Sequence, residues 1–413
     1  MSIKKVDNNR CKLYNSSCNV KRTEMKKKSR ISISAILLLL SLLMVSCTES
    51  EYNNSAQYSS LNSYTQTGDS SELKNKSYNY VSLSEQGEFK LINSEIYNLD
   101  YDTALRISSG SAGSVVRTSI ISKTAGIIIE GENASLNIIT SEIASSGETA
   151  ILVTDKAIMT ASGIELVNVS ETGAGITVRG STAVILNNST VKVYGAGIIT
   201  DAIINVNNTD INADKLVLYS DSSATFSDSH IITENGIMIL GEEDDTEGDA
   251  KLEIEKSNID TSYGTSITVI NTDATVNIYD SVITQNAGCI ISVTNADATV
   301  TVRETDITGD LLVHNNGRMN ILLKDRSNFN GSIPNTTDEY TVIMQIEKGC
   351  TWNVTSDSYI KGLIAESEIL SGIISNGYTI YYDDTCTLNT WLDHQTIVLP
   401  GGGKLIAAKT GEN

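Results

Sequence analysis

Residues 274–283 read ATVNIYDSVI, and residues 298–307 read ATVTVRETDI. Both stretches follow one pattern: a small residue, two aliphatic residues two positions apart, a Ser or Thr, and a final aliphatic residue. Alternation with a period of two is typical of strands and not of helices. Near-identical segments about 24 residues apart also indicate an internal repeat, which has to be interpreted before any fold is assigned.

The same pattern recurs through most of the chain. Further clean copies lie at residues 134–143, 182–191, 202–211 and 250–259. A second alternating run precedes each copy, and Gly, Asn and Asp residues separate the runs. Each unit therefore predicts three short strands joined by tight turns.

One such unit cannot bury its apolar side alone. If successive units coil on top of one another, every aliphatic residue lies beneath its equivalent in the next coil, and the backbones pair at a spacing of about 4.8 Å. The pattern predicts an all-β parallel solenoid with about 22–24 residues and three strands per coil, and roughly eleven coils in all.

The repeated residues 100–333 resemble the bacterial right-handed parallel β-helix proteins of the pectin-lyase-like superfold, specifically their cell-surface, adhesin-like lipoproteins. Residues 351–360, TWNVTSDSYI, resemble the terminal coil of such proteins, and residues 376–382 and 401–405 resemble their C-terminal ending. The resemblance implies right-handed winding and a C-terminal cap. It does not fix the function, because this superfold includes polysaccharide lyases, glycosidases, adhesins and phage tailspikes.

The N-terminal residues are typical of an export signal. Basic residues 26–30 precede an apolar run at 31–45, which is too short for a membrane span. Residues 44–47, Met-Val-Ser-Cys, resemble a bacterial lipobox, so Cys47 is the predicted lipidation site. The alternative is an ordinary signal peptide with a chance cysteine. Met1 and Met25 both remain candidate start residues.

Four segments are expected along the chain. They are an N-terminal extension and lipoprotein signal peptide (1–46), a flexible Ser/Asn/Tyr-rich tether (47–88), the parallel β-helix (89–362), and a final coil with capping strands (363–413). In the last region Trp391 and Tyr381 either seal the core or bind carbohydrate. Cys350 and Cys386 either form a disulfide or remain free thiols.

The charge of the chain excludes one class of partner. Residues 1–46 hold ten of the 30 Lys/Arg and two of the 50 Asp/Glu, which leaves 20 basic and 48 acidic residues and a net charge of about −28. Such a chain repels phosphate backbones, so nucleic-acid binding is not expected. We expect an exported monomer, anchored to the bacterial envelope by lipid on Cys47 and facing the extracellular side.

The outward side of the first strands is the place to look for catalysis, because lyases of this superfold display Ca²⁺-binding Asp residues and a basic residue there. If Ile176 and Val178 point inward, the outward row comprises Ile128, Leu152, Thr177, Ile199, Val217, Met238, Thr268, Ser292 and Leu312. The row holds no carboxylate and no Arg, so it predicts no acid–base chemistry. Its apolar residues are either covered by another segment or form a ligand-binding face.

The glycosidases of the superfold share four motifs in chain order. They are Asn-Thr-Asp, Asp-Asp, Gly-His-Gly and Arg-Ile-Lys. Asn-Thr-Asp occurs at 208–210 and 271–273, but Thr209 is the Ser/Thr of its repeat and 271–273 is a turn, and Gly-His-Gly and Arg-Ile-Lys are absent. The sequence therefore favours a non-catalytic surface protein that acts in adhesion or ligand binding, with a glycan or a host or neighbouring surface protein as its candidate partner. The alternative is a β-helix that binds or degrades polysaccharide.

One acidic turn is a weak calcium candidate. Oxygen-rich loops bind Ca²⁺, but the spacing here does not match an EF-hand and a solvated charged loop is the default interpretation; no other cofactor is expected. The candidate ligands are Glu242, Asp244, Asp245, Glu247 and Asp249.

Overall fold

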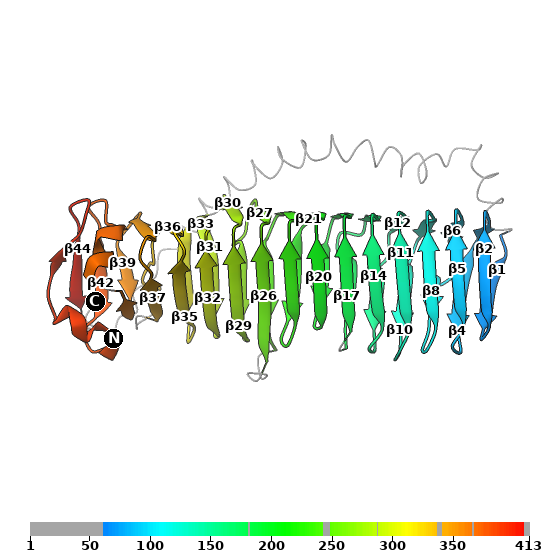
Figure 1. Ribbon diagram of the computed structural model, residues 1–413, viewed down its shortest axis with the longest axis horizontal. Helices are drawn as coiled ribbons and strands as arrows, with labels where there is room; N and C mark the ends of the chain where they lie inside the picture. Colours follow the sequence, from blue (N-terminus) through cyan, green and yellow to red (C-terminus); the bar gives the residue numbers. More distant parts are fainter. Residues whose placement is uncertain are drawn as a thin grey trace, which may run out of the picture. The chain divides into compact units, whose positions relative to one another are not determined.

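The computed structural model describes residues 61–408, except 181, 243–247, 287, 337–340 and 366. Cys47 and the predicted signal peptide lie outside the described residues. The chain divides into two units, Met1–Leu61 and Asn62–Asn413. The second unit is a right-handed parallel β-solenoid (Figure 1), which confirms the predicted fold class.

A full coil contributes one strand to each of three parallel sheets, named A, B and C here; the last two coils contribute to sheets B and C only, so sheet A has 12 strands and the other two have 14 each. The strands of sheet A are β1 (Ser63–Thr67), β4 (Tyr80–Ser84), β7 (Thr103–Ile107), β10 (Ala125–Glu130), β13 (Thr149–Thr154), β16 (Ala174–Val178), β19 (Ala196–Thr200), β22 (Lys215–Tyr219), β25 (Ile237–Leu240), β28 (Ile267–Ile270), β31 (Cys289–Thr294) and β34 (Asp310–His314).

Sheet B follows sheet A in each full coil. Its strands are β2 (Ser70–Lys74), β5 (Glu88–Ile92), β8 (Ala112–Val116), β11 (Ser135–Ile139), β14 (Ile158–Ser162), β17 (Ala183–Asn187), β20 (Ile203–Asn207), β23 (Ser223–Ser227), β26 (Asp249–Glu255), β29 (Asp273–Tyr279), β32 (Asp297–Arg303), β35 (Arg318–Lys324), β37 (Val342–Ile346) and β40 (Gly362–Ile364).

Sheet C completes the coil. Its strands are β3 (Ser77–Tyr78), β6 (Glu95–Asn98), β9 (Ser119–Ser122), β12 (Glu142–Ser145), β15 (Glu165–Asn168), β18 (Thr190–Val193), β21 (Asp210–Ala213), β24 (His230–Thr233), β27 (Asn258–Thr261), β30 (Val282–Gln285), β33 (Asp306–Thr308), β36 (Asn328–Gly331), β38 (Thr351–Val354) and β41 (Ile373–Ile374).

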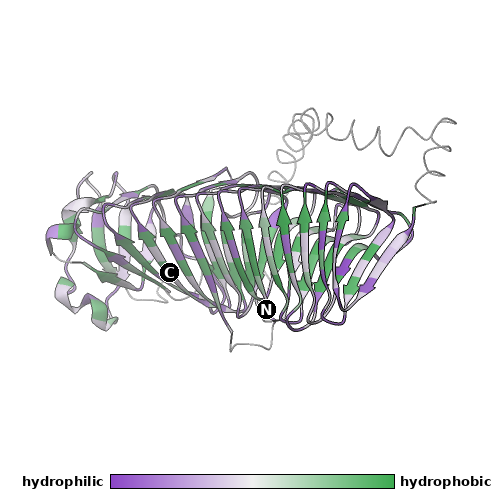
Figure 2. Cartoon of the chain, turned by 45° about the vertical axis from the view of Figure 1, so that its right-hand side comes forward, coloured by the Kyte–Doolittle hydropathy of each residue, from purple (hydrophilic) through white to green (hydrophobic). Residues whose placement is uncertain are grey.

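The core consists of columns of aliphatic side chains. Val276 and Ile278 of β29 pair in register with Val300 and Val302 of β32, and all four are almost completely buried. Apolar residues are concentrated in the strands, while the turns between them are polar (Figure 2). Because one register repeats from coil to coil, each inward side chain packs on its equivalents above and below.

A single left-handed residue bends the chain from sheet B to sheet C. This position has a φ of 47° at Asn208, 49° at Asp228 and 47° at Lys256. Asn and Asp tolerate this conformation better than most residues, which accounts for their frequency before the Ser/Thr of each repeat.

The Ser/Thr of the repeat forms a buried hydroxyl ladder along this bend. The backbone N–H of Ser229 donates to Ser257 Oγ (3.0 Å), and the N–H of Ser257 donates to Ser281 Oγ (3.1 Å). Each hydroxyl in turn donates to a backbone carbonyl, as Ser257 Oγ does to the oxygen of Glu255 (2.8 Å). The ladder satisfies backbone N–H groups that the bend removes from sheet pairing.

The first coil begins earlier than predicted. Residues 63–88, which the sequence assigned to a flexible tether, form β1 to β4 and the start of β5, so the tether prediction is wrong for this part of it. The inward residues of β1 are Tyr64 and Gln66, and the Gln66 amide donates to the carbonyl oxygen of Asp69 (2.9 Å). Polar and aromatic side chains therefore fill the end coil, where the aliphatic pattern fails.

The C-terminal region forms the predicted cap. A separate sheet has the order β39 (Ser358–Ile360), β42 (Thr379–Asp383), β44 (Lys404–Ala408) and β43 (Ile397–Val398), and the 3₁₀ helices are η1 (Ser367–Gly372) and η2 (Thr387–Leu392). Sheet C continues to Ile374, so the coils run past the predicted boundary at 362. Trp352 is completely buried and its indole N–H donates to the Gly331 carbonyl (3.0 Å).

Within the described residues, no helix is long and apolar enough to cross a membrane.

Candidate functional site

The predicted outward row of sheet A is a true column of the structure. Ile128 pairs with Leu152, Leu152 with Thr177, and Thr177 with Ile199, and the same register continues to Leu312. Its members are half-buried or buried, and Thr177 and Val217 expose only 6% and 5% of their surface. Val217 belongs to a small apolar cluster outside the main core, with Ala174, Ala196, Ile199 and Leu240. Little of this row is open to a ligand.

The column also contains a basic residue that the sequence analysis missed. Arg106 of β7 pairs in register with Ile128, so it lies in the same outward row. Its guanidinium forms ion pairs with Glu130 (2.6 Å) and Asp102. These two carboxylates fix the position of the guanidinium. The register of Arg106 could not be assigned from the sequence, because the residues around it fit the repeat pattern poorly.

Two hollows lie at the corner between sheets B and C among the described residues. One hollow, of about 410 Å³, lies near the N-terminal end and is lined by residues such as Arg117, Thr118 and Glu142. The other, of about 350 Å³, lies in the middle of the solenoid. Both occupy the same position in the coil, beside the left-handed residue and the hydroxyl ladder.

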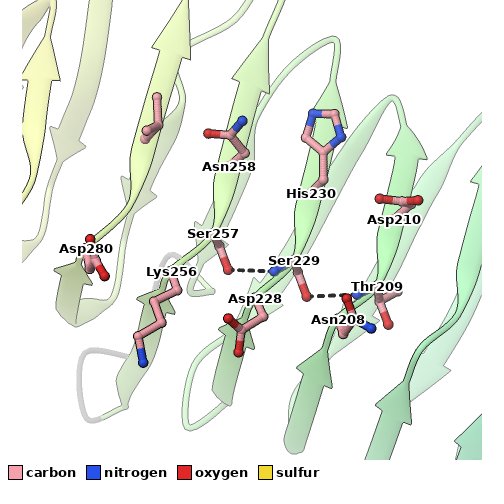
Figure 3. A pocket seen from close by; sticks show the side chains of 11 residues that line it. Asn208, Thr209, Asp210, Asp228, Ser229, His230, Lys256, Ser257, Asn258 and Asp280 are labelled. Atoms are coloured by element: carbon pink, nitrogen blue, oxygen red, sulfur yellow. Dashed lines mark hydrogen bonds between the residues drawn. The ribbon is translucent and has the colours of Figure 1, made fainter.

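The central hollow presents two rows of side chains, all polar except Val282 (Figure 3). One row is the left-handed position, with Asn208, Asp228, Lys256 and Asp280; the other is the first outward position of sheet C, with Asp210, His230, Asn258 and Val282. Ser229 and Ser257 of the ladder lie between the rows. We call these residues the corner hollow.

The corner hollow contains groups of both charges. The His230 Nε2 lies 3.0 Å from Asp260 Oδ2 on the next coil, and both side chains are partly exposed. A hydrogen bond from the ammonium of Lys256 to Glu255 (3.2 Å) raises the pKa of Lys256. These donors and acceptors suit a ligand rich in hydroxyl groups.

The remaining predicted site residues stay apart from this hollow. Asp244, Asp245 and Glu247 of the calcium candidate, and the lipidation candidate Cys47, lie outside the described residues. Glu242 is exposed, and Asp249 opens β26 in register with Asp273. Among the described residues no group of three or more His, Cys, Asp or Glu side chains is arranged to hold a metal ion.

The cysteines and exposed aromatic residues near the C-terminal end form no ligand site: the thiols are free, and the aromatic side chains contact other parts of the chain. Cys350 and Cys386 are free thiols, so the disulfide alternative does not form. Tyr381 stacks on Tyr359 with 4.8 Å between the ring centroids, which covers one ring face. Trp391 is partly exposed, but its indole N–H donates to the Leu363 carbonyl (3.0 Å).

The sequence contained a signal for the corner hollow that the pattern analysis did not use. In three consecutive repeats the hydroxyl residue has polar neighbours on both sides: 208–210 reads NTD, 228–230 reads DSH and 256–258 reads KSN. Residues 208–210 also match the Asn-Thr-Asp motif of the glycosidases, and that match drew attention away from the neighbours of Thr209. Alignment of the repeats at the Ser/Thr would have placed these neighbours in two parallel rows.

Comparison with protein-family models, with curated proteins and with solved structures found no match to this chain.

Proposed function

We propose that this chain is an exported bacterial surface protein, lipid-anchored at Cys47, that acts by binding and adhesion and not by turnover. The observation that carries the proposal is the corner hollow, in which amide, carboxylate, imidazole and ammonium groups from consecutive coils face outward in two rows. The resemblance to adhesin-like β-helix lipoproteins supports the same function. In this proposal the solenoid is the scaffold that displays the rows.

The expected ligand is an extended chain of sugars. Consecutive coils are about 4.8 Å apart, and a pyranose unit of an extended glycan advances by a similar distance. A chain lying along the corner would therefore meet one set of side chains per sugar unit. Binding by many weak, repeated contacts suits adhesion, where avidity compensates for modest single-site affinity.

A glycan array with the purified chain tests the binding proposal. We expect retention on a subset of hydroxyl-rich glycans, and we expect Asp228→Ala with Asn258→Ala to reduce it. Thr275→Ala with Thr299→Ala, on the outward side of sheet B, is the matched control and should bind as the wild type does. Equal binding by all three proteins would place the ligand elsewhere.

Glycan cleavage is the second candidate function. The observation that favours it is the His230–Asp260 pair beside Asp210, because an imidazole oriented by a carboxylate can act as a general base. Release of reducing ends or of unsaturated uronate products from polysaccharides would establish turnover. Loss of that release in His230→Gln, with binding retained, would assign it to this hollow.

Lipidation is tested separately from binding. Metabolic labelling with a fatty-acid analogue should label the wild-type chain and not Cys47→Ser. An unlabelled wild type would leave the binding proposal intact but contradict the anchor.

A further inference from the structure

One stretch of sheet B has no charged residue at its outward positions, unlike the strands of the same sheet on either side of it. Strands β8, β11, β14, β17, β20 and β23 each present three outward positions, and these hold only Ala, Val, Ile, Ser, Thr and Asn. We call these positions the uncharged face. It ends at Lys90 of β5 on one side and at Lys251 of β26 on the other.

Large aliphatic side chains are exposed on this face. Ile158 exposes 50% of its surface and Ile203 exposes 49%, and both lie in one column with Ala183 between them. Ile185 and Ile139 of the same face are also exposed. Single exposed aliphatics are ordinary, but four on four consecutive coils without an intervening charge form a patch that is typical of a contact surface.

We infer that the uncharged face is a self-association surface, on which a second copy of this chain packs sheet against sheet. The charge of the molecule favours this partner. Outside residues 1–46 the chain carries 20 basic and 48 acidic residues. Two such copies repel one another except where a face without charge allows a close approach. A flat face of Ile, Thr, Ser and Asn is also chemically complementary to itself, as an isologous twofold contact requires.

The size of the face sets the strength of the contact. Six strands about 4.8 Å apart, with three outward positions about 6.7 Å apart, cover roughly 600 Å² of sheet. A stable dimer of standard size buries about 800 Å² on each partner. We therefore expect a weak dimer that forms at high concentration, such as that on a crowded surface. The inference does not depend on the anchor or on glycan binding, and it replaces the monomer expected from the sequence.

Sedimentation velocity over a concentration series tests the inference. Residues 62–413 are suitable for the measurement because they form a compact unit with its own core. The wild type should shift from monomer toward dimer as its concentration rises, and added salt should strengthen the dimer by screening repulsion between the copies. Ile158→Lys with Ile203→Lys places two cations on the face and should weaken the dimer at least roughly tenfold.

Ile232→Lys with Val398→Lys is the matched control, because it also adds two cations at exposed residues (36% and 70%), but on β24 and β43, which lie outside sheet B. It should dimerise as the wild type does, and circular dichroism should show the same strand content for all three proteins. A wild type that stays monomeric at the highest attainable concentration overturns the inference. A dimer that forms equally well in the Ile158→Lys, Ile203→Lys variant also overturns it. The same holds if the uncharged face binds a neutral glycan but does not bind a second copy of the chain.

Discussion

Sheet B has two parts with the same backbone arrangement but different outward surfaces. We call β8 to β23 its uncharged half and β26 to β35 its charged half. The inward positions are alike: Leu186 of β17 and Ile254 of β26 are both completely buried in the same kind of aliphatic column. The outward positions differ, since β14 to β20 expose isoleucines while β26 presents Lys251 and Glu253. The core therefore constrains one side of the sheet only.

The charged half also shows how neighbouring coils use their outward residues. Arg303 of β32 forms an ion pair with Asp325 on the next coil (2.6 Å), and its guanidinium lies 4.7 Å from the ring centroid of Tyr279 on the previous one. The uncharged half offers no such partners. The difference indicates that outward residues are selected for what they meet in solution, while inward residues are selected for packing.

The largest effect should come from a cavity in the core. Leu186→Ala and Ile254→Ala each remove a buried side chain from a close-packed column, and each should lower the free energy of unfolding by about 2–5 kcal/mol. Leu186 and Ile254 lie in the same inward column, so both losses should fall within this range. Urea unfolding followed by circular dichroism measures them. A much smaller loss at one site would show that the two halves have different cores.

The side on which each strand residue lies could be predicted from the sequence. The alternating pattern placed Val276 and Ile278 inward and predicted the outward row from Ile128 to Leu312, and the paired register bears out both. This succeeded because a strand alternates strictly, so one correct residue fixes its neighbours. Repetition then carries the assignment from coil to coil.

The ends and the corner hollow could not be predicted in the same way. The first coil has Tyr64 and Gln66 inward, since no further coil of the described residues covers it, and the aliphatic pattern is lost. Arg106 was missed for a different reason: in β8, the strand after it, Gly113 stands where the repeat has an inward aliphatic residue, so the repeat pattern fails there. The role of the repeated Ser/Thr could not be predicted either. Its hydroxyl accepts a hydrogen bond from the backbone of the neighbouring coil, and a single repeat does not show which residues of two coils lie side by side.

A smaller effect should come from the hydroxyl ladder. Ser189→Ala and Ser257→Ala each leave a backbone N–H of the neighbouring coil without its acceptor, at Ile164 (3.2 Å) and at Ser229 (3.0 Å). Each should cost about 1–3 kcal/mol, because an unsatisfied buried donor keeps its desolvation penalty. The ladder runs through both halves, so the two costs should be similar in urea unfolding.

Ser257→Thr is the control for the ladder, because Thr209 and Thr305 occupy the equivalent position in other coils. It should keep the hydroxyl and most of the stability. If Ser257→Ala were as stable as Ser257→Thr, the hydroxyl would not matter, and the recurrence of Ser and Thr would need another reason.

The smallest effect should come from the ion pair of the charged half. Arg303 and Asp325 each expose about half of their side chains (50% and 48%). An exposed pair of this kind contributes about 0–1 kcal/mol to folding, since water and salt screen it. A double-mutant cycle with Arg303→Ala and Asp325→Ala should give a coupling energy in that range, and the coupling should fall as salt is added. A coupling well above this, and insensitive to salt, would mean that outward residues also hold the coils together. The contrast between a core that stabilises and a surface that is free to bind would then fail for this half of the sheet.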